Sequence, residues 1–371
     1  MNNDKKIRLF IFIPTLECGG SEKYVSLLCG HLDKNKFEIT LVVLDNSRPF
    51  YAVKNNAVHV IDLKVKHVRR SLFPIRKVIK EGRPDIVFTA ANHLNLLFAI
   101  FRGLFPKRIR LIAWESSIVS INSRRAKFHL LYNGLLKIFY RRLDFIICQS
   151  AFMERDLVSN YAVAEDRTAV IHSPVEDMTR GETGLRAKED PPKKYQFITI
   201  ARLSEEKGID RLIRAVARLS VPFQYHIIGE GNERERLEQL IGQSSLQDKV
   251  FLEGEKKEPW AGHENADLVL MGSRYEGFPN VLLEAGALGI PVVAFDAPGG
   301  IGEIITDSEN GLLVKDNDEP AFAVTVENAL QMNFDRNKII ADTRERYGMN
   351  MIMNKVEDLL LQLSPHKDDS E

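Results

Sequence analysis

Short apolar runs rich in β-branched residues recur along the chain, and longer amphipathic stretches separate them. Such runs are typical of buried strands, and their alternation with helical patterns predicts parallel βαβ units. In the first half the expected strands span residues 7–15, 38–44, 58–63, 85–89, 109–114, 145–148 and 169–171. In the second half they span residues 197–201, 225–228, 250–252, 268–271, 292–295 and 312–314. Helices are also expected after Glu319 and over residues 350–363.

The periodicity is lost between the two sets of strands, where residues 173–194 collect Pro, Gly, Glu and Lys. Such a segment is typical of a linker, and 371 residues suit two cores better than one. We therefore predict an α/β chain of two Rossmann-like, doubly wound domains over residues 1–173 and 195–345, with a linker over 174–194. Residues 346–371 are expected to form a terminal helix that packs back toward the first domain, then a polar tail.

Composition and charge narrow the class of protein. Hydrophobic and charged fractions of 44% and 27% are those of a soluble globular chain. Cys18, Cys29 and Cys148 lack the spacing of a disulfide framework or of a zinc site, which favours a reducing compartment. No apolar run approaches the ~20 residues that cross a bilayer, and the first residues lack a signal-peptide pattern. A cytoplasmic protein is expected.

A net charge of zero conceals an asymmetry between the two halves. Residues 1–173 hold 28 Lys and Arg against 15 Asp and Glu, and the remaining residues hold 23 against 36. A basic first half suits an anionic membrane surface or a phosphate-bearing acceptor, although a solvated basic face explains it equally well. No familiar nucleic-acid-binding signature is present, so nucleic acid is not an expected partner.

Candidate binding residues follow the first strand of each half. Open α/β sheets bind ligands at the carboxyl ends of their strands, so the two domains are expected to share a cleft that holds the site. Gly19 and Gly20 permit a tight turn whose amides face a phosphate or a sugar, or else a purely structural turn. Arg202 and Lys207 suit a diphosphate, the alternative being a surface loop paired to its own glutamates. Dinucleotide and ATP motifs are absent.

Two further glycine-rich loops follow later strands. Gly229 and Glu230, with a second glycine after them, indicate either close approach of the backbone to a ligand or a plain turn. Residues 298–303, with three glycines in four positions, are expected to form a flexible loop that closes over a ligand, or a connector without one.

The segment from Glu276 to Glu284 is the most informative. Asn280 is predicted to cap a helix that begins at Val281, and the helix N-terminus favours an anion. Glu284 lies one turn into that helix, in an apolar run where a carboxylate without a partner would be costly, which favours a functional role. The turn before the cap offers its backbone amides to the same ligand and consists of Gly277, Phe278 and Pro279.

Together these segments resemble the retaining glycosyltransferases of family 4, which have the two-domain GT-B fold. The resemblance spans nearly the whole chain and includes the two glutamates with seven residues between them. It implies transfer of a hexose or N-acetylhexosamine from a nucleotide diphosphate sugar, with UDP preferred as the commoner nucleotide, and no metal or other cofactor. The implied acceptor is a lipid-linked or cell-envelope glycan. Two alternatives stay open: a UDP-sugar 2-epimerase of the same fold, and a non-catalytic sugar-nucleotide-binding protein.

The resemblance also implies roles for individual residues. Arg202 and Lys207 would bind the diphosphate and stabilise the leaving group, Glu276 would hold sugar hydroxyls, and Glu284 would hold the ribose. The Gly19–Gly20 loop would close over the donor. Anomeric configuration would be retained, by attack on the face from which the phosphate leaves.

One departure from the family pattern concerns the sugar contacts. Family members often carry a Glu-His pair after the strand that ends here at Trp114, whereas this chain has Glu115 and Ser116. The role of the histidine would then pass to Ser116, Glu115 or the nearby His93.

The acceptor side is indicated by two basic stretches with aromatic residues, 96–110 and 123–142. Basic residues beside an aromatic face suit a helix that lies on a membrane, and the alternative is a core helix with a charged edge. Contact with the inner face of the plasma membrane is therefore a hypothesis of the sequence.

Overall fold

The computed structural model describes residues 6–53, 56–178 and 194–365. The chain divides into two compact units, one formed by Met1–Pro174 with Asn350–Glu371 and the other by Val175–Met349. Most of the predicted linker, residues 179–193, lies outside the described residues. Across the described ranges, no helix combines the length and the apolar character that crossing a membrane requires.

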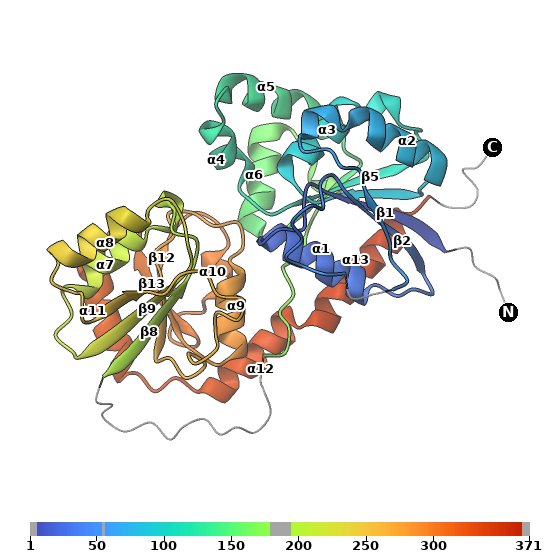
Figure 1. The fold of residues 1–371 in the computed structure, drawn as a ribbon. Coiled ribbons are helices and arrows are strands. Elements are labelled where there is room, and N and C mark those ends of the chain that lie inside the picture. The colour runs from blue at the N-terminus through green and yellow to red at the C-terminus, as the bar shows by residue number, and fades with distance from the viewer. Residues whose placement is uncertain (1–5, 54–55, 179–193, 366–371) are drawn as a thin grey trace. The chain divides into compact units, whose positions relative to one another are not determined.

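The first unit is built on a parallel sheet of order β3-β2-β1-β4-β5-β6-β7. The central strands are apolar because helices cover both faces of the sheet, with α1 and α13 on one side and α2 and α3 on the other (Figure 1). The strands are β1 (Ile7–Ile13), β2 (Phe37–Val43), β3 (His59–Asp62), β4 (Ile86–Thr89), β5 (Arg110–Glu115), β6 (Phe145–Cys148) and β7 (Thr168–Val170). The helices are α1 (Gly20–His31), α2 (Leu72–Gly82), α3 (Asn92–Ile100), α4 (Val119–Arg125), α5 (His129–Phe139), α6 (Ala151–Tyr161) and α13 (Met349–Leu363).

The terminal helix α13 belongs to the first unit through an apolar face and one polar anchor. Ile352, Val356 and Leu360 recur at helical spacing and are each fully buried. Beside them, Glu357 accepts hydrogen bonds from the Asp33 amide at 2.6 Å and from Lys36 Nζ at 2.9 Å. Partners from the loop before β2 therefore offset the cost of burying this carboxylate.

The second unit is built on a parallel sheet of order β10-β9-β8-β11-β12-β13. In Figure 1, α7, α8 and α11 lie on one side of this sheet and α9 and α10 on the other. The strands are β8 (Tyr195–Ile200), β9 (Phe223–Ile228), β10 (Val250–Leu252), β11 (Leu268–Met271), β12 (Val292–Asp296) and β13 (Gly311–Lys315). The helices are α7 (Ile209–Val216), α8 (Arg234–Gln243), α9 (Asn280–Ala287), α10 (Ile301–Ile304), α11 (Glu319–Gln331) and α12 (Arg336–Tyr347).

The two strand orders confirm the predicted doubly wound class, and all thirteen predicted strands are present within two residues of their predicted ends. Each order reverses once, between β1 and β4 in the first sheet and between β8 and β11 in the second. The loops after the strands beside such a reversal diverge to opposite faces of the sheet and leave room for a ligand. In this chain those loops carry most of the predicted site residues.

Candidate functional site

The strand-order reversal of the second unit brings Lys207 and Glu276 together. Lys207 ends the short 3-10 turn that follows β8, and Glu276 lies in the loop after β11. Lys207 Nζ donates to Glu276 Oε1 at 2.6 Å, and Ser273 Oγ donates to the same oxygen at 2.6 Å. The side chains of Lys207 and Glu276 are 20% and 11% exposed, so the pair is largely shielded and still reachable from solvent. Two of the three predicted catalytic residues therefore form one group.

Close contact between the two loop backbones makes this pairing possible. Gly208 has φ of +56°, and a Cβ there would lie 2.0 Å from the carbonyl oxygen of Gly272. Any other residue would therefore push the loops apart. Buried Arg211 locks the contact, because its guanidinium donates to the carbonyls of Gly272 and Ser273 and pairs with Asp316 at the end of β13.

Arg202, the third predicted catalytic residue, is not drawn into this group. Its side chain is 77% exposed and its guanidinium lies 3.6 Å from Glu206, which is the surface pairing that the sequence left as an alternative. Arg202 nevertheless follows β8 in the same loop as Lys207. A guanidinium so exposed is able to change partner at little cost, since ion pairs at the surface contribute about 0–1 kcal/mol.

The loop over residues 298–303 differs from its prediction. We expected a flexible closing segment, but its backbone is bonded to the Glu276 segment. The Glu276 amide donates to Pro298 O at 3.0 Å, and the Gly300 amide donates to the carbonyls of Glu276 and Gly277 at 3.2 and 3.0 Å. A Cβ on Gly299, where φ is +127°, would overlap the Glu276 carbonyl oxygen. These glycines therefore fix the Glu276 backbone in place and do not form a lid.

The predicted cap of α9 is also wrong. Pro279, with extended φ and ψ of −75° and 107°, precedes the helix, and Asn280 is its first residue. Because Asn280 is inside the helix, its side chain cannot reach the amides that a cap would bind, and its Oδ1 is buried without a hydrogen-bond partner. The Phe278 side chain packs in the core with its ring 5.7 Å from that of Tyr347, so the ring itself does not face a ligand.

Glu284 has a partner that the sequence did not indicate. Trp260 is 6% exposed, and its indole Nε1 donates to Glu284 Oε2 at 2.9 Å. The two residues are 24 positions apart, and the tryptophan lies in a segment with no motif. Ser273 was also missed, although its place three residues before Glu276 at the end of β11 was a signal within reach.

The Gly229–Glu230 loop lies against the loop of Arg202. Gly229 has φ of +146°, and a Cβ there would lie 1.9 Å from the Ala201 carbonyl oxygen. The Leu203 amide donates to Glu230 O at 2.9 Å, whereas the Glu230 carboxylate is paired with Arg234 at 2.5 Å. The glycine is thus required by contact between two loops, and the Glu230 side chain points to its own helix.

In the first unit, the glycine loop and the position of the family histidine lie side by side. Gly19 precedes α1 with φ of −175°, an ordinary extended conformation, and α1 begins at Gly20. Ser21 Oγ, in the first turn, donates to Ser116 Oγ at 3.0 Å, which joins the loop after β1 to the end of β5. His93 is exposed at the start of α3, with Nδ1 3.4 Å from the Tyr132 hydroxyl.

Glu115 is not available as a sugar contact. Its side chain is fully buried, and Oε1 accepts hydrogen bonds from Asn95 Nδ2 and the Tyr140 hydroxyl, both at 2.7 Å. Burial raises the pKa of this carboxyl from 4.5 to about 7, although both hydrogen bonds oppose the shift. Residues 111–115 of β5 are all buried, so Glu115 lies in the core at the end of the strand, and Ser116 follows it.

Comparison with known families decides the identity of the fold. Residues 18–177 match the model described as Glycosyltransferase Family 4, and residues 182–346 match that described as Glycosyl transferases group 1. The chain is a family-4-like glycosyltransferase. Its two units have the Rossmann-like architecture of the GT-B fold.

Individual relatives agree with this membership. An N-acetylgalactosaminyltransferase of Campylobacter jejuni, whose name gives a diphospho-undecaprenol-linked acceptor, is 29% identical over 327 residues, 85% of this glycosyltransferase and 88% of the relative. The amylovoran biosynthesis glycosyltransferase AmsD of Erwinia amylovora is 24% identical and covers 95% of this chain and 99% of its own. The structure of Anabaena HepE in complex with UDP-glucose has a TM-score of 0.77 at 18% identity, covering 96% of this chain and 100% of HepE.

Burial of Glu115 generates a prediction about pH. Between pH 4.5 and about 7 the folded carboxyl keeps a proton that the unfolded chain has released, so the free energy of unfolding falls as pH rises through this window and levels off above it. Glu115→Gln cannot titrate and lacks this fall. Its stability relative to wild type should therefore rise by about 3 kcal/mol between pH 4.5 and 8. Urea denaturation followed by Trp114 fluorescence in a Trp260→Phe background measures it.

The exposed Glu165→Gln serves as the control and should follow the wild-type curve at every pH. A Glu115→Gln difference that does not change with pH would show that the carboxyl is ionised in the fold.

Proposed function

We propose that this glycosyltransferase moves a hexose or N-acetylhexosamine from a UDP-sugar to a lipid-linked or cell-envelope glycan, with retention of configuration and without a metal. The observation that carries the proposal is the Lys207–Glu276–Ser273 group beside the strand-order reversal of β8 and β11. A single largely shielded ammonium there, with an exposed guanidinium in the same loop, suits an anion of two phosphates.

The chemistry assigned to each residue follows from its position. The bond between the anomeric carbon and the donor phosphate oxygen breaks, and negative charge develops on the UDP that leaves. Lys207 stabilises that charge, and Arg202 exchanges Glu206 for the phosphates. The acceptor hydroxyl attacks from the face on which the phosphate leaves and passes its proton to a phosphate oxygen, so the configuration is retained.

Hydroxyl groups of the donor are assigned to the two glutamates. Glu276 is bonded to Lys207 and Ser273 through one oxygen, Oε1, which leaves Oε2 to accept from the sugar. Glu284 is held by the indole of Trp260, and its carboxylate is assigned to the ribose. The backbone amides of Gly277, Phe278 and Asn280 and the Gly229–Glu230 loop complete the donor side, and Gly19, Gly20 and Ser116 are assigned to the sugar or the acceptor; Pro279, which has no amide hydrogen, shapes the turn.

The names of relatives support the nucleotide and the acceptor class. HepE is titled as a complex with UDP-glucose, and the Campylobacter enzyme is named for a diphospho-undecaprenol acceptor. The epimerase alternative is not favoured, because the relatives reported above are named as glycosyltransferases or solved with a nucleotide sugar.

A surface of the first unit supports peripheral contact with anionic lipid. Phe128, Leu130 and Leu131, at the start of α5, are 69%, 78% and 65% exposed. Arg124 and Arg125 end the preceding helix. Exposed apolar side chains beside basic ones suit insertion at the boundary between headgroups and acyl chains.

The donor site predicts large losses without loss of fold. Lys207→Ala and Glu276→Ala should each lower kcat by about 10²–10³, as removal of one group that stabilises developing charge does. Glu284→Ala should mainly raise the KM for the donor. The donor for the assay is the nucleotide sugar that raises the melting temperature of the protein most, and its rate of turnover at varied concentration gives kcat and KM. The exposed Lys315→Ala and Glu235→Gln are matched controls, and full activity of both Lys207→Ala and Glu276→Ala would contradict the assignment.

Retention predicts the stereochemistry of the product. If attack and departure share one face, the new glycosidic bond has the anomeric configuration of the donor. The one-bond C–H coupling at the anomeric carbon of the product, measured by NMR before any further step, reports it. An inverted product would rule out front-face attack while leaving the donor site intact.

The apolar patch predicts binding to anionic vesicles at low salt and release at high salt, because the basic contribution is screened. In a liposome flotation assay, Leu130→Ser with Leu131→Ser should lower the bound fraction about tenfold through lost apolar burial. Val324→Ser, which removes a 58% exposed residue from the second unit, is the control. Equal flotation of all three proteins would exclude this patch, and no flotation of wild type would exclude membrane contact.

A further inference from the structure

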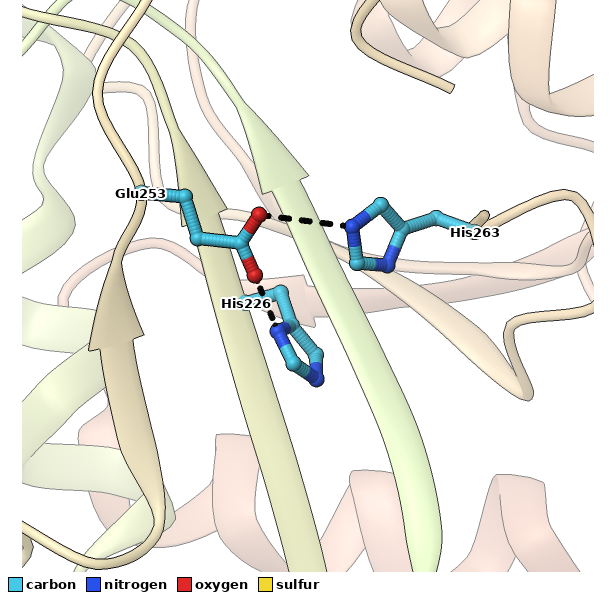
Figure 2. Close-up of side chains that lie close together, drawn as sticks. All are labelled: His226, Glu253 and His263. Carbon is cyan, nitrogen blue, oxygen red and sulfur yellow. Dashed lines mark hydrogen bonds and ion pairs between the residues drawn. The ribbon is translucent and has the colours of Figure 1, made fainter. Parts of the chain in front are cut away.

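A cluster of metal-ligating side chains lies in the second unit, apart from the Lys207–Glu276 group in sequence and in partners. His226 on β9, Glu253 after β10 and His263 in the following loop each present one ligand atom, and these atoms lie within 4.8 Å of one another. Figure 2 shows both imidazoles directed at the Glu253 carboxylate. His226 Nδ1 lies 2.5 Å from Oε1, and His263 Nε2 lies 3.5 Å from Oε2.

The set suits a borderline divalent ion. Two imidazole nitrogens and one carboxylate are a recurrent zinc ligand set with an open fourth position. Tetrahedral bonds of 2.0–2.1 Å place ligand atoms about 3.3 Å apart, a spacing that small rotations of these side chains reach. The three side chains are only 15–20% exposed, so part of the cost of ordering them has already been met by the fold. Packing of the His226 ring against Phe251, 5.3 Å between centroids, fixes it further.

Lys256 places a positive charge at the carboxylate of Glu253, where a metal ion would also bind. Its ammonium contacts Glu253 Oε2, the oxygen that faces His263. The Glu253 carboxylate therefore lies against both imidazoles and one ammonium, between the two histidines that would share a metal ion with it. Lys256 is an exposed residue on a flexible stem, so it is able to withdraw when a metal ion binds.

The cluster also positions two parts of the proposed donor site. Next to Glu253, the Gly254 carbonyl accepts the Gly229 amide at 2.9 Å. Three residues before His263, Trp260 donates to Glu284. Joining β9 to the 253–263 segment therefore fixes both the Gly229 loop and the partner of Glu284.

We propose that His226, Glu253 and His263 bind a divalent transition-metal ion, zinc foremost, as a structural site outside the transfer chemistry. Its effect on donor affinity, unlike the metal binding itself, rests on the proposed function. The bound ion replaces Lys256 at Glu253 and holds the 253–263 segment against β9.

The test uses the full chain, purified without a polyhistidine tag and stripped with a chelator. In a titration against a chromogenic competitor, wild type should bind one equivalent of zinc. Glu253→Gln and His263→Ala should each lower the zinc affinity at least about tenfold. Lys256→Gln should bind zinc several-fold more tightly than wild type, because a competing cation is removed. Glu255→Gln and Lys257→Gln, exposed neighbours of each position, should match wild type. Cobalt should give the intense visible bands of a tetrahedral site in wild type and should not give them in Glu253→Gln or His263→Ala.

Every result of these titrations either supports or contradicts the metal site. Equal zinc affinity of wild type, Glu253→Gln and His263→Ala, with all three folded by circular dichroism, would overturn the proposal and leave a carboxylate that only hydrogen-bonds two imidazoles. Calorimetric titration with UDP, with and without zinc, separates this from the function. Zinc binding without UDP binding would refute the donor site alone, whereas UDP binding without the specific zinc equivalent would refute the metal site alone.

Discussion

The contact between the backbones after β8 and β11 is the constraint on which the rest of the proposed donor site depends. Gly208 approaches the Gly272 carbonyl so closely that no Cβ fits, and only at that separation does Lys207 reach Glu276. Buried Arg211 closes the same contact with bonds to two carbonyls, stacked 4.0 Å from the Phe295 ring. A single buried guanidinium thus satisfies carbonyls that would otherwise be orphaned and sets the geometry of the pair next to it.

Shielding a carboxylate from water costs free energy, and the two glutamates of the proposed donor site offset this cost with different partners. Glu276 is paired with Lys207, the proposed source of positive charge for the donor phosphates, and its backbone is fixed by the Gly299 contact. Glu284 is held by a neutral indole donor, and its proposed role is to accept hydrogen bonds from hydroxyl groups. Glu115 has neither a cation nor solvent, and the consequence is a pKa near 7 and no role at the surface.

The strands could be predicted from the sequence because a strand that is buried on both faces consists of a short run of consecutive apolar residues. The ends of those strands also located Lys207 and Glu276, since the carboxyl edge of a parallel sheet is where such loops meet. What failed depended on contacts between distant segments. Asn280 looked like a cap because its residue type suits one, yet Pro279 takes that place. Glu115 was one of three candidates for the role of the family histidine, and the sequence did not show that Asn95 and Tyr140 would enclose it.

The His226–Glu253–His263 cluster shows the same limit most clearly. Cysteine spacing was the only metal signal read from the sequence, and it says nothing of ligands that are 27 and 10 positions apart and meet only when β9 and β10 pair. Because β9 ends in the Gly229 loop and the segment after β10 carries Trp260, whatever fixes this cluster also fixes two parts of the proposed donor site. Rigidity there would reduce the ordering cost of binding a nucleotide sugar, so the proposed ion would act on donor affinity, whereas the chemical step is proposed for Lys207 and Glu276.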